Sequence, residues 1–212
     1  MKFLLFVEGH TEKKALPGFL KRWLDIQLRN PVGIDTVRFE GWPEFRKNIS
    51  RKARLHLDGP NQDKILAVIS LMDLYGPTFY PERTTTWKER CEWAKKDIET
   101  EVNHPNFFQF FAVHETEAWL LSDPSIFPSA IRPELLKKGT QPENVNFDEP
   151  PAKLLERLYN ERLHQKYKKI VHGTQLFNKL DPDIAREKCP HLKDMLDTML
   201  RLARENETTT LN

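Results

Sequence analysis

The sequence predicts an α/β domain built on a mostly parallel sheet. Two observations support this fold class. Short segments that are either uniformly apolar or alternate between apolar and polar residues recur along the first half of the chain, as expected for β-strands. Between them lie segments whose apolar residues have the spacing of an α-helix. The strand-like runs are residues 3–7, 34–39, 65–72 and 107–113. The resulting β-α-β-α-β-α-β order is typical of a parallel sheet whose two faces are covered by helices.

The first run, residues 3–7, is uniformly apolar and ends in a Glu-Gly turn. Thr11 suits the N-cap of the helix that follows, because its hydroxyl can accept a backbone N–H. That helix ends near Asn30. Residues 34–39 alternate in polarity and form the second strand, and a basic helix over residues 44–57 follows it.

The third run, residues 65–72, is the clearest strand of the sequence, and Asp73 follows it directly. A helix over residues 86–101 leads to the fourth run. After residue 122 the character changes, and Pro, Glu and Asn are frequent over residues 133–151. This composition favours a connector or an exposed insertion.

Three helices are predicted after this connector, over residues 152–168, 173–180 and 191–205. We therefore expect residues 1–122 to form the α/β core. Residues 123–212 form a connector and a helical C-terminal region that packs on that core.

Composition excludes several classes of protein. Of the 212 residues, 39% are hydrophobic and 30% charged, which is enough to build a core and excludes a disordered chain. The net charge of +2 excludes a histone-like protein. Cys91 and Cys189 cannot form a disulfide framework, and we expect two reduced thiols. The first apolar run is too short for a signal peptide or a membrane span, so we expect a cytoplasmic protein without a membrane partner.

Acidic residues follow three of the predicted strands. Glu8 follows the first, Asp73 the third, and Glu115 and Glu117 the fourth. A single acid at a strand end is ordinary, but the carboxyl ends of parallel strands share one edge of the sheet. Carboxylates gathered there repel one another unless a cation is present. Hard oxygen ligands favour Mg²⁺ or Mn²⁺, so the sequence predicts a site for one of these ions.

Four segments resemble a known family. VEGHTE (7–12) is similar to the first motif of Toprim domains, and MDLYG (72–76) to their second. HETEAWLLSD (114–123) resembles a segment of the DUF4276 family of Toprim-like proteins. YKKIVHG (167–173) and the later CP (189–190) resemble the C-terminal signature of that family. The resemblance covers nearly the whole chain and implies a Toprim-like sheet flanked by helices, with a helical C-terminal extension.

The resemblance also implies roles for the acids. Glu8 takes the place of the general acid/base or of a metal ligand, and Asp73 that of the principal metal ligand. Tyr75 stands where Toprim domains carry a second aspartate. Glu115 and Glu117 are the available substitutes. On a helix they would point about 200° apart, whereas on a strand they would share a face, and the sequence leaves both possibilities open.

Further residues are candidates for contacts with a phosphate or a nucleic acid. Lys169 can stabilise charge on the scissile phosphate, although it also fits a solvated basic face. Weaker candidates for phosphate or nucleic-acid binding are His10, Thr11, His172, Arg46 and Lys47. The basic residues of segment 44–57 also fit a solvated helix face.

The resemblance implies a Mg²⁺- or Mn²⁺-dependent Toprim-type nuclease that hydrolyses DNA or RNA. Similar proteins are often encoded beside an ABC-like ATPase in prokaryotic anti-phage modules, and this sequence contains no P-loop of its own. We therefore expect an effector nuclease that works with an ATPase partner. The nuclease could also form a homodimer. The alternatives are a metal-binding subunit that docks without cutting and a phosphotransferase or hydrolase of small phosphoesters.

Overall fold

The computed structural model describes residues 1–144 and 149–209. Within them, a four-stranded sheet has the order β2-β1-β3-β4, and each pair of neighbouring strands is parallel. The strands are β1 (Lys2–Val7), β2 (Gly33–Arg38), β3 (Ile65–Asp73) and β4 (Phe107–Ala112). The predicted α/β class is confirmed, and so are all four strands to within a residue or two at their ends.

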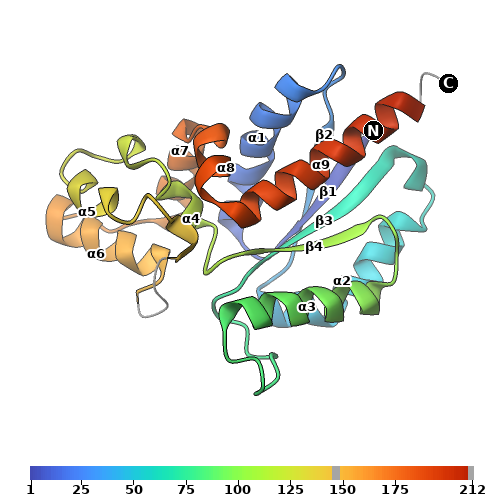
Figure 1. Cartoon of the computed structure of the whole chain (residues 1–212), viewed down its shortest axis with the longest axis horizontal. Helices are drawn as coiled ribbons and strands as arrows, with labels where there is room; N and C mark the ends of the chain where they lie inside the picture. Colours follow the sequence, from blue (N-terminus) through green and yellow to red (C-terminus); the bar gives the residue numbers. More distant parts are fainter. Residues whose placement is uncertain (145–148, 210–212) are drawn as a thin grey trace.

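Helices cover both faces of the sheet (Figure 1). One face carries α1 (His10–Gln27) and α9 (Pro190–Thr209), and the other carries α2 (Trp42–Leu57) and α3 (Trp87–Val102). Successive side chains of β1 therefore enter different cores: Leu5 packs with the α1 and α9 layer, and Phe6 with the α2 and α3 layer. This explains why β1 is apolar at every position.

The remaining helices gather beside the sheet, at the left of Figure 1 for α4, α5 and α6. They are α4 (Glu117–Leu120), α5 (Arg132–Leu136), α6 (Pro151–Leu163), α7 (Lys169–Lys179) and α8 (Pro182–Lys188). The single predicted helix over 152–168 is wrong, because His164 adopts a left-handed conformation with φ 51° and ends α6. The next helix begins at Lys169, four residues before its predicted start, and α8 was not predicted.

The expected N-cap of the first helix is also wrong. Gly9 is the N-cap of α1, in an extended conformation and without a side-chain cap, and His10 is the first helical residue. Thr11 lies within the first turn and is buried. The helix therefore begins two residues after Glu8.

Part of the connector that was expected to be exposed is buried. Glu143 is 4% exposed, and its carboxylate accepts hydrogen bonds from His191 N at 3.0 Å and Leu192 N at 3.4 Å. It thereby satisfies two amides in the first turn of α9. Burial raises the pKa of Glu143 to about 7. Residues 145–148 of this connector lie outside the described residues.

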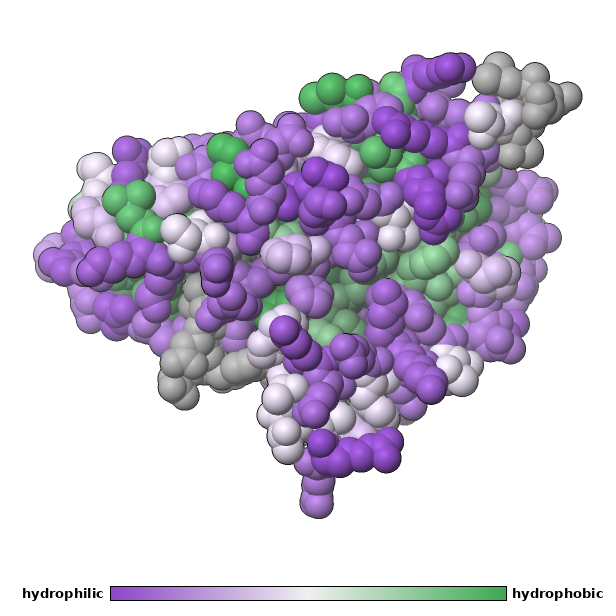
Figure 2. All heavy atoms as spheres, in the orientation of Figure 1, coloured by the Kyte–Doolittle hydropathy of each residue, from purple (hydrophilic) through white to green (hydrophobic). Residues whose placement is uncertain are grey.

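Polar side chains cover most of the face seen in Figure 2, while apolar side chains show between α9 and α3, where β4 forms the edge of the sheet. Both cysteines are buried free thiols, as predicted. Throughout the described ranges, no helix combines the length and the apolar character needed to cross a membrane.

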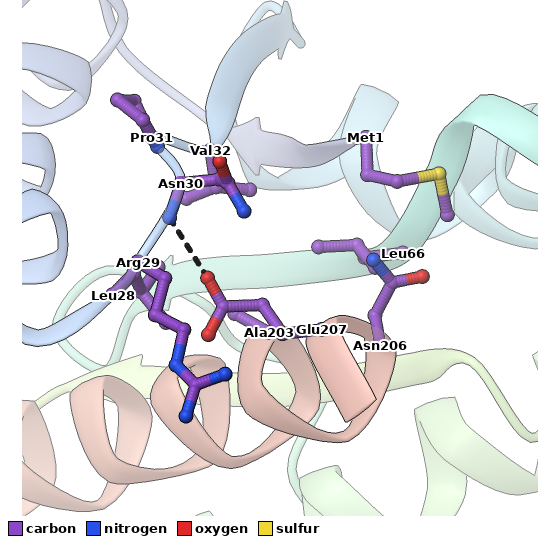
Figure 3. Close-up of a pocket in the computed structure, with 10 residues that line it drawn as sticks. All are labelled: Met1, Leu28, Arg29, Asn30, Pro31, Val32, Leu66, Ala203, Asn206 and Glu207. Carbon is purple, nitrogen blue, oxygen red and sulfur yellow. Dashed lines mark hydrogen bonds between the residues drawn. The ribbon is translucent and has the colours of Figure 1, made fainter. Parts of the chain in front are cut away.

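A pocket of about 280 Å³ lies where the strands begin (Figure 3). Met1, Val32 and Leu66 line it from the sheet side, and Glu207 of α9 accepts a hydrogen bond from Asn30 N at 2.9 Å. The hydrogen bond joins the end of α9 to the loop between α1 and β2. The pocket is at the opposite edge of the sheet from the acidic residues described next.

Candidate active site at the carboxyl edge of the sheet

Acidic side chains gather where β1, β3 and β4 end. Glu8 follows β1, Asp73 is the last residue of β3, and Glu115 and Glu117 follow β4. These three strands are neighbours and run in the same direction, so their carboxyl ends lie side by side. The sheet topology thus brings four of the predicted site residues to one edge.

A chain of hydrogen bonds connects the acids. Glu8 Oε1 accepts from Asp73 N at 3.2 Å, and Asp73 Oδ1 accepts from Thr116 N at 3.2 Å. The Thr116 hydroxyl donates to Glu12 Oε1 at 3.0 Å. The ends of three strands and the first turn of α1 are therefore held in one network.

Glu12 is a site residue that the sequence analysis did not single out. It is 6% exposed, and its Oε2 atom is buried without a hydrogen-bond partner among the described residues. Its place in the VEGHTE segment was a usable signal. With Thr11 expected at the N-cap, however, there was no reason to expect that Glu12 turns towards Glu8.

Gly9 is required by this arrangement. A Cβ atom at this position would lie 2.2 Å from Glu12 Oε2. Real Cβ atoms do not approach another atom so closely, so any larger residue would push the Glu12 carboxylate away. The glycine between the two glutamates therefore allows Glu12 to occupy the site.

The segment after β4 is neither a continued strand nor a regular helix. His114 is buried with φ 66°, and α4 begins at Glu117. This bend brings both glutamates to Lys169: its Nζ lies 3.0 Å from Glu117 Oε2 and 3.8 Å from Glu115 Oε1. The Glu115 Oε2 atom accepts from Ala152 N at 2.9 Å, in the first turn of α6.

Burial and mutual repulsion raise the pKa values of the carboxyl groups in the cluster. Burial, helped by the nearby Glu12, raises the pKa of Glu8 to about 7, although the Asp73 amide and Lys169 act in the opposite direction. Burial also raises the pKa of Glu117 to about 7. The pKa of Asp73 is well above its ordinary range, first through burial and then through Glu12, Glu8 and Glu117.

Lys169 is the positive charge within this cluster. Burial acts to lower its pKa, but attraction to Glu117, Asp73, Glu115 and Glu12 outweighs burial and leaves the pKa above its ordinary value. The ammonium group therefore stays protonated. It offers three donors, and its side chain is 37% exposed, so it remains accessible to a ligand.

The donor chemistry of the cluster fits a hard divalent cation. Carboxylate oxygens are the preferred ligands of Mg²⁺, and the Glu12 oxygen without a partner is available to bind one. As the side chains stand, no group of three His, Cys, Asp or Glu residues in the described ranges is arranged to hold a metal ion. Binding would therefore require rotation of carboxylates such as Glu8, Glu12 and Asp73.

Tyr75 follows β3, two residues after Asp73. Its amide donates to His114 O at 3.0 Å, so the backbone is fixed to the segment after β4, and its side chain is 45% exposed. Gly76 follows with φ 107°, a conformation that favours glycine, and the chain turns away.

The weaker candidates for phosphate binding have different surroundings. His10 is exposed in the first turn of α1, whereas Thr11 is buried, and its methyl group lies close to Gly173 of α7. His172 accepts a hydrogen bond from Lys168 N at 2.9 Å. Burial therefore argues against a phosphate contact for Thr11, and His172 already has a structural partner.

The two basic candidates on α2 also differ. Arg46 pairs with Asp97 at 2.6 Å and with Glu101, both on α3, so its guanidinium connects two helices. A phosphate contact by Arg46 would break these ion pairs. Lys47 is exposed.

Fold and site together define a class: a parallel α/β protein with a carboxylate cluster and one lysine at the carboxyl edge of its sheet. Residues 7–200 match the family model described as "Domain of unknown function (DUF4276)". The chain therefore belongs to the DUF4276 family, which confirms the resemblance seen in the sequence. No curated protein matches the sequence.

Two solved structures are similar over nearly the whole chain. The C-terminal region of the Burkholderia pseudomallei OLD protein has a TM-score of 0.48 at 18% identity, covering 95% of this chain and 98% of that one. The C-terminal region of the Xanthomonas campestris pv. campestris OLD protein has a TM-score of 0.48 at 17% identity, covering 98% of this chain and 97% of that one.

Proposed function

We propose that this protein is a nuclease of the Toprim type, which hydrolyses phosphodiester bonds with the help of Mg²⁺ or Mn²⁺. The observation that carries the proposal is the convergence of Glu8, Glu12, Asp73 and Glu117 on Lys169 at one edge of the sheet. Buried carboxylates with raised pKa values are costly for the fold, and they suit a site that binds a divalent cation.

The ion would supply charge stabilisation at the phosphodiester and favour an activated water. Asp73 and Glu12 would hold it, with Glu115 or Glu117 as a further ligand. Lys169 would meet a non-bridging phosphate oxygen and stabilise the negative charge that grows in the transition state.

Glu8 would take the proton from the attacking water. A general base works best when its pKa lies near the operating pH, and the pKa of Glu8 is about 7. As the water oxygen bonds to phosphorus, the bond from phosphorus to the leaving sugar oxygen breaks, and a solvent water gives that oxygen a proton. The products are a phosphate monoester and a free hydroxyl at the two new ends.

The test is cleavage of plasmid, single-stranded DNA, tRNA and mRNA, each with Mg²⁺, Mn²⁺ or EDTA. Wild type is compared with Asp73→Ala and with Asp63→Ala, which removes an exposed acid outside the site. We expect metal-dependent cleavage by wild type and Asp63→Ala and none by Asp73→Ala. Cleavage that survives in Asp73→Ala or in EDTA contradicts the proposal.

A second candidate function is a metal-binding subunit that docks on a partner without cutting. Tyr75 at the position of the second Toprim aspartate favours it, because a phenol is a poor ligand for a hard cation. Metal binding by a folded wild type that cleaves none of the four substrates, alone or with its partner, supports this function.

The family resemblance also motivates a proposal about context. The protein would act in an anti-phage module with an ABC-like ATPase that restrains or triggers it. Co-expression with any ABC-like ATPase that is encoded beside it tests this directly. We expect the two proteins to purify together and ATP to change the cleavage rate.

A further inference from the structure

Lys169 is the first residue of α7, so its position depends on how that helix begins. The N-cap of α7 is Lys168, whose side chain caps none of the amides. Instead, Nδ1 of His172 accepts a hydrogen bond from Lys168 N at 2.9 Å. His172 lies one turn into the helix. The His172 amide in turn donates to Lys168 O at 2.8 Å. Two hydrogen bonds thus join His172 to the residue that immediately precedes Lys169.

The His172 ring is held in place by two tyrosines. It stacks on Tyr159 of α6 with the ring centroids 5.1 Å apart and the planes 28° apart. It also lies 5.6 Å from the ring of Tyr167, which meets Tyr159 edge to face at 5.1 Å. Ring pairs at these separations are attractive and restrict rotation of the imidazole.

The first turn of α7 also lies tightly against α1. A Cβ atom on Gly173 would be 3.0 Å from the Thr11 methyl carbon and 3.6 Å from the Tyr167 hydroxyl. Thr11 is next to Glu12, which belongs to the acidic cluster. The start of α7 therefore has little room to shift relative to the carboxylates that Lys169 faces.

We propose that His172 is a positioning residue for Lys169: its ring fixes the start of α7 and thereby holds the Lys169 ammonium against Glu117. This differs from the phosphate contact that the sequence suggested for His172. Only the catalytic consequence rests on the proposed nuclease function. The position of Lys169 can be measured whether or not the protein is a nuclease.

Two substitutions separate the parts of the His172 side chain. His172→Phe keeps a ring for Tyr159 and removes the acceptor for the Lys168 amide. His172→Asn keeps an acceptor at nearly the same place, since its Oδ1 corresponds to Nδ1, and removes the ring. The matched control is His104→Phe. His104 Nδ1 accepts from Asn106 N at 3.1 Å, the same type of bond in the turn between α3 and β4.

The first readout is the ¹⁵N NMR signal of the lysine Nζ groups, with the Lys169 signal assigned by its loss in Lys169→Arg. We expect His172→Phe to shift or broaden the Lys169 signal, while His172→Asn largely restores it and His104→Phe leaves it unchanged. An unchanged Lys169 signal in folded His172→Phe overturns the proposal. If His172→Phe does not fold, His172→Ala takes its place, and an unchanged Lys169 signal in that folded variant overturns the proposal.

The second readout is the rate of nucleic-acid cleavage. A misplaced Lys169 should lower kcat about tenfold or more with little change in KM, and His172→Asn should recover part of the loss. A shifted Lys169 signal with unchanged kcat overturns the catalytic consequence. A wild type that cleaves nothing removes the nuclease proposal alone, because the NMR readout still tests the position of Lys169.

Discussion

The Lys169 ammonium lies 3.0 Å from Glu117 Oε2, and the Glu117 side chain is completely buried. The two residues come from the first turns of α7 and α4, so one ion pair joins the C-terminal helices to the end of β4. Removing one partner of such a pair leaves the other charge buried and unmatched, which is more harmful than removing both.

Lys169→Met should therefore destabilise the protein at pH 8. Because the lysine is 37% exposed, we expect a loss of about 2 kcal/mol rather than the larger values typical of fully buried pairs. Lys169→Met combined with Glu117→Gln should recover most of it. Urea unfolding followed by circular dichroism measures these differences, with Lys168→Met as the control for the exposed neighbour. Equal stability of the single and double variants contradicts the prediction.

Stability without metal should fall as the pH rises from about 5 to 8. The folded-state pKa of Glu8 is about 7, above its ordinary value of 4.5, so folding takes up a proton in this range. This contribution is complete below pH 4.5 and is lost as the pH passes 7. Glu8→Gln should reduce the fall by on the order of 2 kcal/mol. The measurement is the free energy of unfolding in EDTA at several pH values.

The effect of Mg²⁺ on the pH dependence of stability should distinguish Glu8 from Glu143. Glu143 also has a pKa of about 7, but it caps α9 away from the cluster. Added Mg²⁺ should reduce the part of the pH dependence of stability that Glu8 causes. It should not change the part that Glu143 causes, which is the part that Glu143→Gln removes. A pH dependence that Mg²⁺ does not alter would show that the ion does not bind at the carboxylates.

Gly9→Ala should weaken metal binding more than it weakens the fold. The new Cβ would lie 2.2 Å from Glu12 Oε2, so the Glu12 carboxylate must move away. The end of a side chain moves more easily than the backbone does, so the fold should be affected less than the site. We expect a stability loss of about 1 kcal/mol together with a clear loss of Mn²⁺ affinity in calorimetric titration. Gly18→Ala is the matched control, because no atom lies within 4 Å of its added Cβ. In a helix interior it should stabilise by up to about 1 kcal/mol.

Tyr75→Asp should increase the affinity for Mg²⁺ or Mn²⁺ several-fold. The side chain is 45% exposed, so the substitution should not disturb the core, and it adds a carboxylate two residues after Asp73. Titration with Mn²⁺ followed by electron paramagnetic resonance measures the affinity. Tyr75→Phe is the control, and an affinity unchanged by Tyr75→Asp shows that position 75 points away from the ion.

The strands could be predicted because a strand that is buried on both faces has a continuous run of apolar residues in the sequence. In β1 every residue from Phe3 to Val7 is buried, so no polar residue interrupts the run. The end of α6 could not be predicted in the same way. His164 adopts a left-handed conformation that few residues other than glycine take, and nothing in the neighbouring residues signals it.

Part of the site could be predicted because the positions of the strands could be predicted. Acids at strand ends follow from strand positions, so Glu8 and Asp73 could be placed together. The meeting of Glu115 and Glu117 at Lys169 depends on the bend at His114, which residue types do not reveal. The ion pairs of Arg46 with α3 join residues about 50 positions apart, and only the packed fold brings them together.

The order of the site residues along the chain has a consequence for synthesis. Arg22 of α1 donates to Phe177 O across 155 positions, and Glu8 and Lys169 are separated to a similar extent. Contacts of such high sequence separation form late, because long loops must close first. A chain emerging from the ribosome exposes its acidic cluster well before Lys169 exists to balance it. The complete site is therefore absent from the nascent chain until α7 has been translated.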